Sequence, residues 1–183
     1  MGKLLFLLSL IILIPVSVNA EERFKAGTWE LSLHTSASDI DISPSIGYFI
    51  LDNVEAIVHI DYSKITYDFP TGDNDVDSTN YMFEAGVLYN IPITANIEPA
   101  IVPFIIGEIT YFRQKEDVEN STTLDSTFDG FGIDAGLGIR FLVGKIASIN
   151  TSFMFGVADL DVDDSSVDVT GYGFDISYSL FFH

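Results

Sequence analysis

One stretch decides the fold class of this chain: Tyr172-Gly173-Phe174-Asp175-Ile176-Ser177-Tyr178-Ser179-Leu180-Phe181-Phe182. Every second side chain from Tyr172 to Phe182 is large and apolar, and most of the side chains between them are small or polar. Successive side chains leave opposite faces of a β-strand, so this period of two predicts a strand with one apolar face. A helix would not keep the alternation over the whole stretch.

The same alternation recurs upstream and predicts eight strands in all. They cover residues 29–34, 45–50, 55–63, 81–89, 100–112, 131–141, 149–157 and 172–182. The fifth is the weakest, because both of its phases begin apolar and because Pro103 removes a ladder hydrogen bond. We retain it as a strand because the alternation returns from Glu108 to Tyr111.

The segments between the predicted strands alternate in length and chemistry. Four are longer and acidic, at about residues 36–41, 68–79, 114–127 and 159–169, and three are tighter, at 52–53, 91–96 and 144–145. Up-and-down connectivity puts the two kinds at opposite ends, as in barrels with long extracellular loops and short periplasmic turns. The sequence therefore predicts an all-β fold, an eight-stranded antiparallel up-and-down transmembrane β-barrel with four longer acidic extracellular loops and three short periplasmic turns.

The alternation alone permits two barrels, a soluble lipocalin-like carrier with its apolar face inward and a membrane barrel with that face outward. The polar phase is rich in Gly and Ser and nearly free of Lys, which is unlike a water-facing surface. Small residues suit the crowded interior of an eight-stranded barrel. The apolar phase carries aromatic residues toward the strand ends, as at the two interfaces of a bilayer. These features favour the membrane barrel.

The N-terminus has the pattern of a secretory signal. Lys3 precedes an apolar run at residues 4–14, Pro15 ends the run, and Val18-Asn19-Ala20 is a small-x-small cleavage site. The run is too short for a membrane-spanning helix, which needs about 20 residues. We expect a signal peptide at residues 1–20 and one outer-membrane β-barrel domain at residues 21–183.

The charge of the chain excludes some partners. The formal net charge is −19, and loss of Lys3 with the signal would make it −20. Nucleic acid is excluded as a partner because its phosphates need Lys and Arg, and bare anionic lipid is disfavoured for the same reason. There is no Cys, so no disulfide staples the fold.

Four stretches carry a family resemblance: Ser45-Ile46-Gly47-Tyr48-Phe49, Pro103-Phe104, Gly136-Leu137-Gly138-Ile139-Arg140 and the closing run at residues 173–182. On them the chain resembles the small eight-stranded outer-membrane β-barrels of Gram-negative bacteria, a porin-like group that includes OmpX, OmpW and the OmpA membrane domain. The resemblance implies export through the periplasm to the cell outer membrane. It also implies contact with outer-membrane lipid and lipopolysaccharide, and handling by the barrel-assembly machinery. That machinery reads a terminal aromatic residue, and here Phe182 is followed by His183.

The inward phase holds the candidate site residues. Buried charges must pair or lose their charge, and Arg140 is the inward arginine of this pattern. We expect Arg140 to be the hub of a lumen charge network with Glu84, Glu108, Asp134 or Glu30. The favoured interpretation is a structural plug that holds the lumen together, and the alternative is a gate or narrow ion path. The other inward charged or titratable residues are Glu55, Asp61, Asp175, His34 and His59.

No metal, cofactor or catalytic residue is predicted. Asp73, Asp75 and Asp77, with Glu84 at the twelfth position, copy the spacing of an EF-hand, but Ser78 stands where that loop needs Gly. The acidic loops are interpreted as solvated, with divalent ions bridging them to lipopolysaccharide phosphates as the alternative. None of the three histidines stands in a Ser-His-acid order that would support a nucleophile.

The functional prediction is therefore a non-catalytic, integral outer-membrane barrel with a structural, adhesion or envelope-interaction role through its acidic surface loops. One alternative is a narrow porin-like channel for ions or small hydrophobic molecules. An open aqueous porin is disfavoured, because water-filled lumens come with about 16 strands. The soluble lipocalin-like carrier remains as the last alternative.

Overall fold

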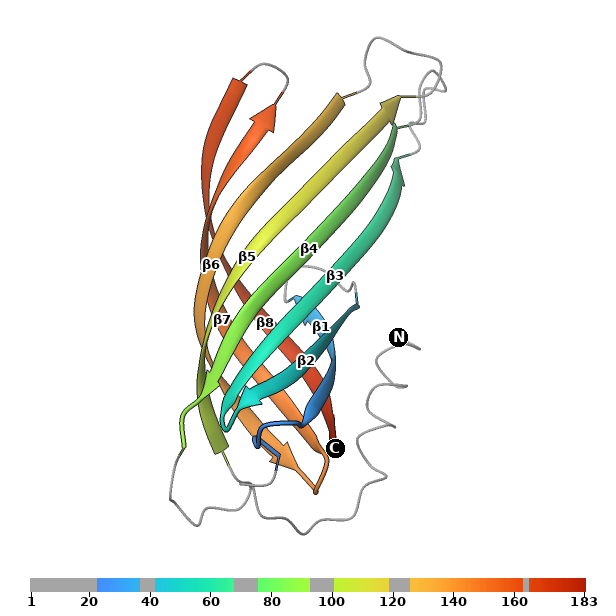
Figure 1. Cartoon of the computed structure of the whole chain (residues 1–183). Helices are drawn as coiled ribbons and strands as arrows, with labels where there is room; N and C mark the ends of the chain where they lie inside the picture. The colour runs from blue at the N-terminus through green and yellow to red at the C-terminus, as the bar shows by residue number, and fades with distance from the viewer. Residues whose placement is uncertain (1–22, 37–41, 68–75, 93–100, 119–125, 163–164) are drawn as a thin grey trace.

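The computed structural model describes residues 23–36, 42–67, 76–92, 101–118, 126–162 and 165–183, and these form a closed barrel (Figure 1). Each strand pairs antiparallel with the next along the chain, and the last pairs with the first. This confirms the predicted all-β, eight-stranded antiparallel barrel. The strands are β1 (Trp29–Ser36), β2 (Ser43–Leu51), β3 (Val54–Tyr67), β4 (Val76–Asn90), β5 (Ile101–Val118), β6 (Ser126–Val143), β7 (Ala147–Val162) and β8 (Ser165–Phe182).

Several strands extend into segments that we predicted as loops, and those boundaries are wrong. β4 begins at Val76, β5 runs to Val118, and β8 begins at Ser165. Across β3 and β4, Lys64 Nζ lies 2.8 Å from Asp77 Oδ2, so polar cross-strand pairs continue the ladder beyond the apolar part. The predicted turn at 91–96 begins directly after β4, which ends at Asn90, and residues 93–96 of that turn lie outside the described residues. The remaining loop residues and the predicted signal at 1–20 lie outside the described residues.

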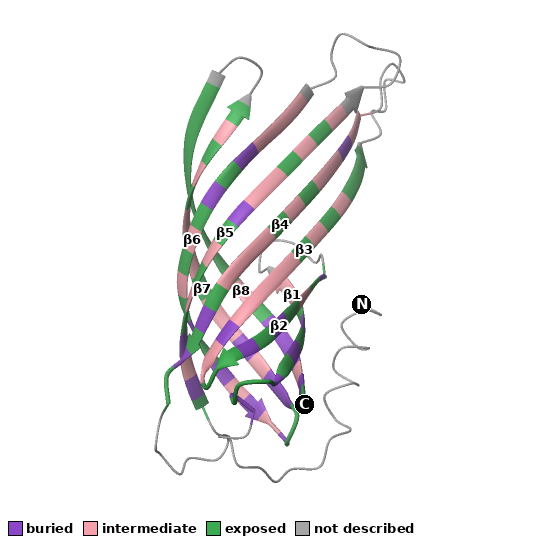
Figure 2. Cartoon of the chain, in the orientation of Figure 1, coloured by how far each residue is buried: buried purple, intermediate pink, exposed green. Residues whose placement is uncertain are grey.

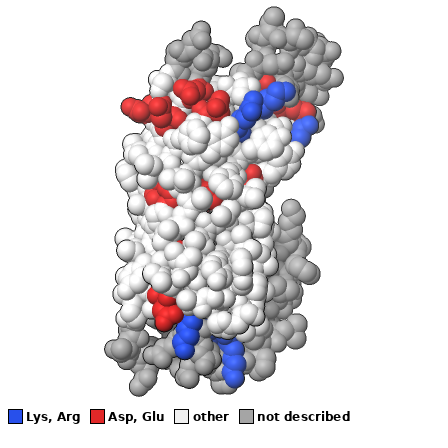
Figure 3. Space-filling model, viewed as in Figure 1, with Lys and Arg blue, Asp and Glu red and all other residues white. Residues whose placement is uncertain are grey.

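The barrel turns its apolar phase outward. Leu137, in the middle of β6, is 64% exposed, whereas Arg140 on the opposite phase of the same strand is 1% exposed. Figure 2 shows this as alternating exposed and covered residues along the strands, and Figure 3 shows a mostly uncharged band between charged groups at the two ends. This arrangement is the reverse of the lipocalin-like alternative, in which the apolar side chains would fill the interior.

Aromatic pairs mark both edges of the uncharged band. Trp29 and Tyr48 lie near the lower end, with ring centroids 4.7 Å apart. Tyr62 and Tyr81, with centroids 5.3 Å apart, lie further up on β3 and β4. Aromatic side chains of this kind gather at the two interfaces of a bilayer. No helix among the described residues is long and apolar enough to cross a membrane.

The wall is uneven in height because β1 and β2 are short. The last β2–β3 pair is Ser45 with His59, and the last β1–β8 pair is Ser36 with Asp175. Above these pairs, residues 60–67 of β3 and 165–174 of β8 have strand partners on one side only within the described chain. We call the interval between these two strand edges the wall gap (Figure 1).

Candidate functional site

The lower half of the lumen is tied together by one buried arginine. Arg140 of β6 donates to Glu30 of β1 and Glu55 of β3, with Nη1 2.5 Å from Glu30 Oε2 and Nη2 2.8 Å from Glu55 Oε2. All three side chains are buried, and Glu55 is 0% exposed. Because the strands come from different parts of the wall, the guanidinium links opposite sides of the barrel. We call these three residues the Arg140 cluster.

Aromatic rings close the space around the Arg140 cluster. The guanidinium carbon lies 5.8, 5.5 and 5.6 Å from the ring centroids of Phe24, Phe104 and Phe181, within the range of cation–π attraction. Phe24 also packs against Phe49, with centroids 5.7 Å apart, and against Phe181, at 5.8 Å. Together these four rings and the Arg140 cluster form the floor of the lumen, and Phe24 comes from the segment that precedes β1.

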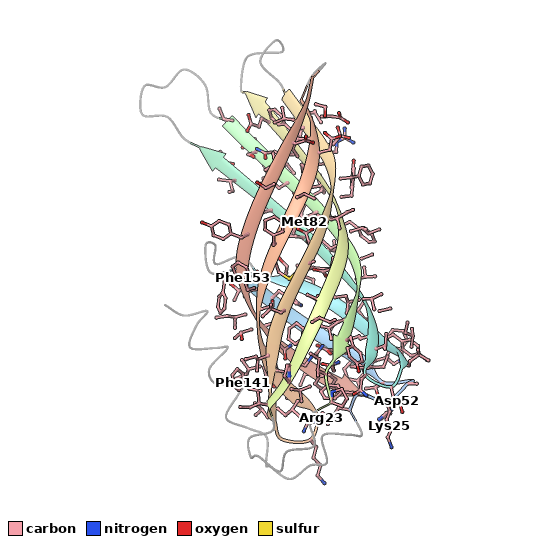
Figure 4. The ribbon with its side chains drawn as sticks, turned by 90° about the vertical axis from the view of Figure 1, so that its left-hand side faces the viewer. Arg23, Lys25, Asp52, Met82, Phe141 and Phe153 are labelled. Carbon is pink, nitrogen blue, oxygen red and sulfur yellow. The ribbon has the colours of Figure 1, made fainter. Side chains whose placement is uncertain are left out.

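The segment before β1 is itself anchored to the wall. Arg23 Nη1 donates to the Ala147 carbonyl at 2.9 Å, and Figure 4 places Arg23 at the lower end of the barrel, well below Met82. Burial lowers the pKa of Arg23 to about 10, so the guanidinium keeps its charge at neutral pH. This bond holds Phe24 in its place in the floor.

A layer of small polar side chains lies above the floor. Ser32 donates to Glu30 Oε1 at 2.8 Å, and its hydroxyl also lies 2.7 Å from that of Ser179. Asn150 Nδ2 donates to Ser177 and Ser179 at 3.0 and 2.7 Å. The hydroxyls and the amide satisfy one another, as buried polar groups must.

The upper half of the lumen is a cavity of about 620 Å³. Glu84 Oε2 lies 2.6 Å from His59 Nδ1, and Thr110 donates to Glu84 at 3.3 Å and to Asp134 at 2.5 Å. Glu108 lines the same space and has no hydrogen-bond partner among the described residues. The other carboxylates of the lining are Asp61 and Asp175, and the described lining contains no Lys or Arg.

The structure divides the predicted network into two levels. It brings Arg140 together with Glu30, and adds Glu55, an inward residue that we did not name as a partner. Glu84, Glu108 and Asp134 line the cavity above instead and do not contact Arg140.

Sequence reasoning missed the aromatic part of the floor. Phe49, Phe104 and Phe181 lie on the inward phase, which also holds apolar residues such as Met82 and Phe112 higher in the lumen, and all three stand near the lower ends of their strands. Their shared position at the lower ends was the available signal for a closed end. Phe24 lies outside every predicted strand and gave no such signal.

Inward glycines make room for the carboxylates. A Cβ on Gly47 would lie 1.7 Å from Glu55 Oε1, and a Cβ on Gly156 would lie 1.8 Å from Asp134 Oδ1. A side chain at either position would have to displace the neighbouring carboxylate, which occupies that space. This accounts for two of the mid-strand glycines that set the polar phase apart.

The EF-hand spacing does not form a loop in the described residues. Asp77 pairs with Lys64 on the outer face of the barrel, whereas Glu84 on the same strand faces the cavity. Asp73 and Asp75 lie outside the described residues. Within the described ranges, no group of three or more His, Asp or Glu side chains is arranged to hold a metal ion.

The histidines make different contacts. His34 Nε2 lies 2.8 Å from the Ser45 hydroxyl, and its ring stacks on His59 with centroids 5.0 Å apart. No carboxylate hydrogen-bonds to His34 in the described part of the lumen, so the Ser45–His34 pair lacks the acid of a triad. His183 contacts the Thr28 hydroxyl at 3.3 Å at the lower end.

The fold is similar to solved outer-membrane barrels. It resembles Neisserial surface protein A, with 16% identity, a TM-score of 0.56 and coverage of 85% of this chain and 94% of that one. It resembles OprG from Pseudomonas aeruginosa, with 12% identity, a TM-score of 0.54 and coverage of 87% and 98%. It also resembles the N-terminal β-barrel domain of Pseudomonas aeruginosa OprF, with 13% identity, a TM-score of 0.50 and coverage of 85% and 96%.

No protein-family model and no curated protein sequence matches the chain. The structural likeness therefore speaks for the fold, and the outward apolar band agrees with it. Together they confirm the predicted class: the chain is a small eight-stranded β-barrel of the outer-membrane type.

Proposed function

We propose that this protein is a non-catalytic outer-membrane barrel that interacts with molecules at the cell surface through its external end and is closed at its periplasmic end. The short turn at residues 52–53 and the connection at 144–146 lie at the floor end, which supports a periplasmic position for the floor. The upper ends of β3 to β8 then carry the surface loops.

One observation carries the proposal, and it is the floor. A conducting path would have to pass the Arg140 cluster, whose charges are paired and buried, and the rings of Phe24, Phe49, Phe104 and Phe181. Pairs of this kind hold a structure together, whereas pores are lined by hydrated or exposed charges. The floor therefore favours a barrel that is closed at its periplasmic end over the alternative of a narrow porin-like channel.

The charge of the external end supports surface interaction as the role. The strand tips carry exposed acidic residues such as Asp159, Asp161 and Asp168, and the adjoining loop sequences at 68–75 and 119–125 add more. Exposed carboxylates favour cationic partners, or lipopolysaccharide phosphates bridged by divalent ions. We expect no catalysis in this role.

Planar-bilayer recording of the refolded barrel tests the closed floor. We expect no conductance steps from the wild type at neutral pH. Reproducible unit conductance from the wild-type barrel would refute the proposal that the periplasmic end is closed and would favour the channel.

A binding assay tests the surface role. The variant Asp159→Asn/Asp161→Asn/Asp168→Asn should retain less lipopolysaccharide in calcium buffer than the wild type. The matched control is Asp52→Asn, which removes a carboxylate at the opposite end and should bind as the wild type does. Equal retention by all three proteins would contradict a role for the acidic external end.

A further inference from the structure

The cavity in the upper lumen extends to the wall gap. Its lining includes Thr35, Ser43 and Asp61 from one side of the gap and Gly171, Tyr172 and Gly173 from the other. Tyr172 belongs to the outward phase of β8 and is 84% exposed, yet it also borders the cavity. In the part of the chain that the structure describes, the space inside the barrel therefore reaches the outer surface sideways, past the edge of β8.

The lower rim of the wall gap lies at the level of the upper aromatic pairs. Tyr62 on the β3 edge and Tyr172 on the β8 edge both point outward, and each has an aromatic neighbour on the next strand, Tyr81 and Phe153 respectively. Just below them, Ile60 and Phe174 are exposed and apolar. The rim thus stands where the outer leaflet meets water, since aromatic belts mark that interface.

The interior behind the gap favours a cation. Asp61, Glu84, Glu108, Asp134 and Asp175 line the cavity, and no Lys or Arg is present in its described lining. The basic groups of that lining are His34 and His59, and His59 lies 2.6 Å from Glu84, so carboxylates outnumber basic groups. A cavity with an excess of one sign of charge and walls of low dielectric constant concentrates ions of the opposite sign. The volume of about 620 Å³ falls within the range of small-molecule sites, which is roughly 300–1,000 Å³.

We propose that the cavity and the wall gap form a binding site for a cationic amphiphile, a primary amine on a long alkyl chain. The ammonium group lies among Glu108, Asp134 and Asp175, and the alkyl chain passes over the lower rim between Tyr62 and Tyr172 and lies along Ile60 and Phe174 in the outer leaflet. This inference rests on the proposed function, because the closed floor is what makes the upper lumen a binding site instead of one section of a pore.

A displacement assay tests the ligand class. The probe is a long-chain diamine dansylated at one end, bound to the barrel in phosphatidylcholine nanodiscs and followed by fluorescence anisotropy. We expect dodecylamine to displace it at a concentration at least about tenfold lower than dodecanol or dodecanoate, because only the amine carries a positive charge. Butylamine should displace it more weakly than dodecylamine, because it has no chain to fill the gap. Equal displacement by dodecylamine and dodecanol would overturn the role of the carboxylates, and equal displacement by butylamine would overturn the role of the gap.

Two pairs of variants test the two parts of the site. Glu108→Gln/Asp175→Asn should weaken dodecylamine binding by about tenfold and leave dodecanol unchanged. Asp168→Asn, on the outer face of the same strand as Asp175, should behave as the wild type. Gly173→Phe should abolish binding by placing a ring at the rim, because Gly173 lines the cavity and a Cβ there meets nothing within 4 Å.

Gly107→Phe is the control for added bulk, because Gly107 lies on the lipid-facing phase of β5. Each variant is first shown to fold by its heat-modifiable gel mobility. Unchanged dodecylamine binding by Gly173→Phe, or equal losses in Asp168→Asn and Glu108→Gln/Asp175→Asn, would overturn the site. A barrel that is silent in planar bilayers but does not bind dodecylamine refutes this inference alone, whereas a conducting wild type refutes the proposed function.

Discussion

Replacing Arg140 by Met removes the only cation in contact with two buried carboxylates and keeps the length of the side chain. Arg140 lies 2.5 Å from Glu30 and 2.8 Å from Glu55, and neither carboxylate has another cationic partner among the described residues. Removing one partner of a buried ion pair costs about 3 to 5 kcal/mol. Because one guanidinium serves two carboxylates here, we expect a loss near the upper end, about 5 kcal/mol. Urea unfolding of barrels in phosphatidylcholine vesicles, read by gel mobility, measures it.

Two further variants show whether charge is the cause. Glu30→Gln/Glu55→Gln/Arg140→Met removes every charge of the cluster and should recover most of the loss, since no uncompensated charge stays buried. Arg113→Met removes an exposed arginine near the external end and should change stability by less than about 0.5 kcal/mol. The reasoning is refuted if Arg140→Met lies within about 1 kcal/mol of the wild type. It is also refuted if the triple variant is no more stable than Arg140→Met.

Three other substitutions probe the lipid-facing band, the packing of the lumen and the floor. Leu137→Arg should cost about 2 to 4 kcal/mol in the same unfolding assay, because it places a charge at mid-bilayer; no loss would mean that Leu137 does not face lipid. Gly47→Ala should cost about 1 to 3 kcal/mol, because its Cβ overlaps Glu55. Gly107→Ala, where a Cβ meets nothing closer than 4.0 Å, should cost little, and equal losses would contradict the packing argument. Phe24→Ala should produce ion conductance in planar bilayers by opening the floor, and a silent variant would show that the remaining groups close it.

The central part of each strand can be predicted from the sequence because every residue of the uncharged band faces one of two environments, either lipid or the barrel interior. Lipid selects large apolar side chains outside, and the narrow interior selects small or paired polar ones inside, so the period of two is nearly unbroken in β6 and β8. Above the band both faces meet water and the alternation fades. The start of β4 at Val76 and the end of β5 at Val118 are then set by cross-strand partners, which a single-strand pattern does not contain.

The membership of the Arg140 cluster required the register of the whole barrel. Asp134 and its cross-strand partner Glu108 stand six residues up the ladder from Arg140, which is about 20 Å along a strand. Glu30 and Glu55 reach the guanidinium from other walls because the strands are tilted and staggered around the axis. Periodicity identifies which charges face inward, but their heights follow only once every strand is paired.

The distribution of charge along the lumen has one physical cause. A carboxylate without a cation keeps its charge only where water reaches it, whereas in a dry interior it needs a paired cation. Glu55 is fully covered and touches Arg140, whereas Glu108, which has no hydrogen-bond partner among the described residues, lies in the upper cavity away from any Lys or Arg of the described lining. The closed floor and the open acidic cavity therefore depend on each other. Moving Arg140 up the barrel would leave Glu30 and Glu55 without their cation and would place a positive charge in the upper cavity, where a cationic ligand is expected to bind.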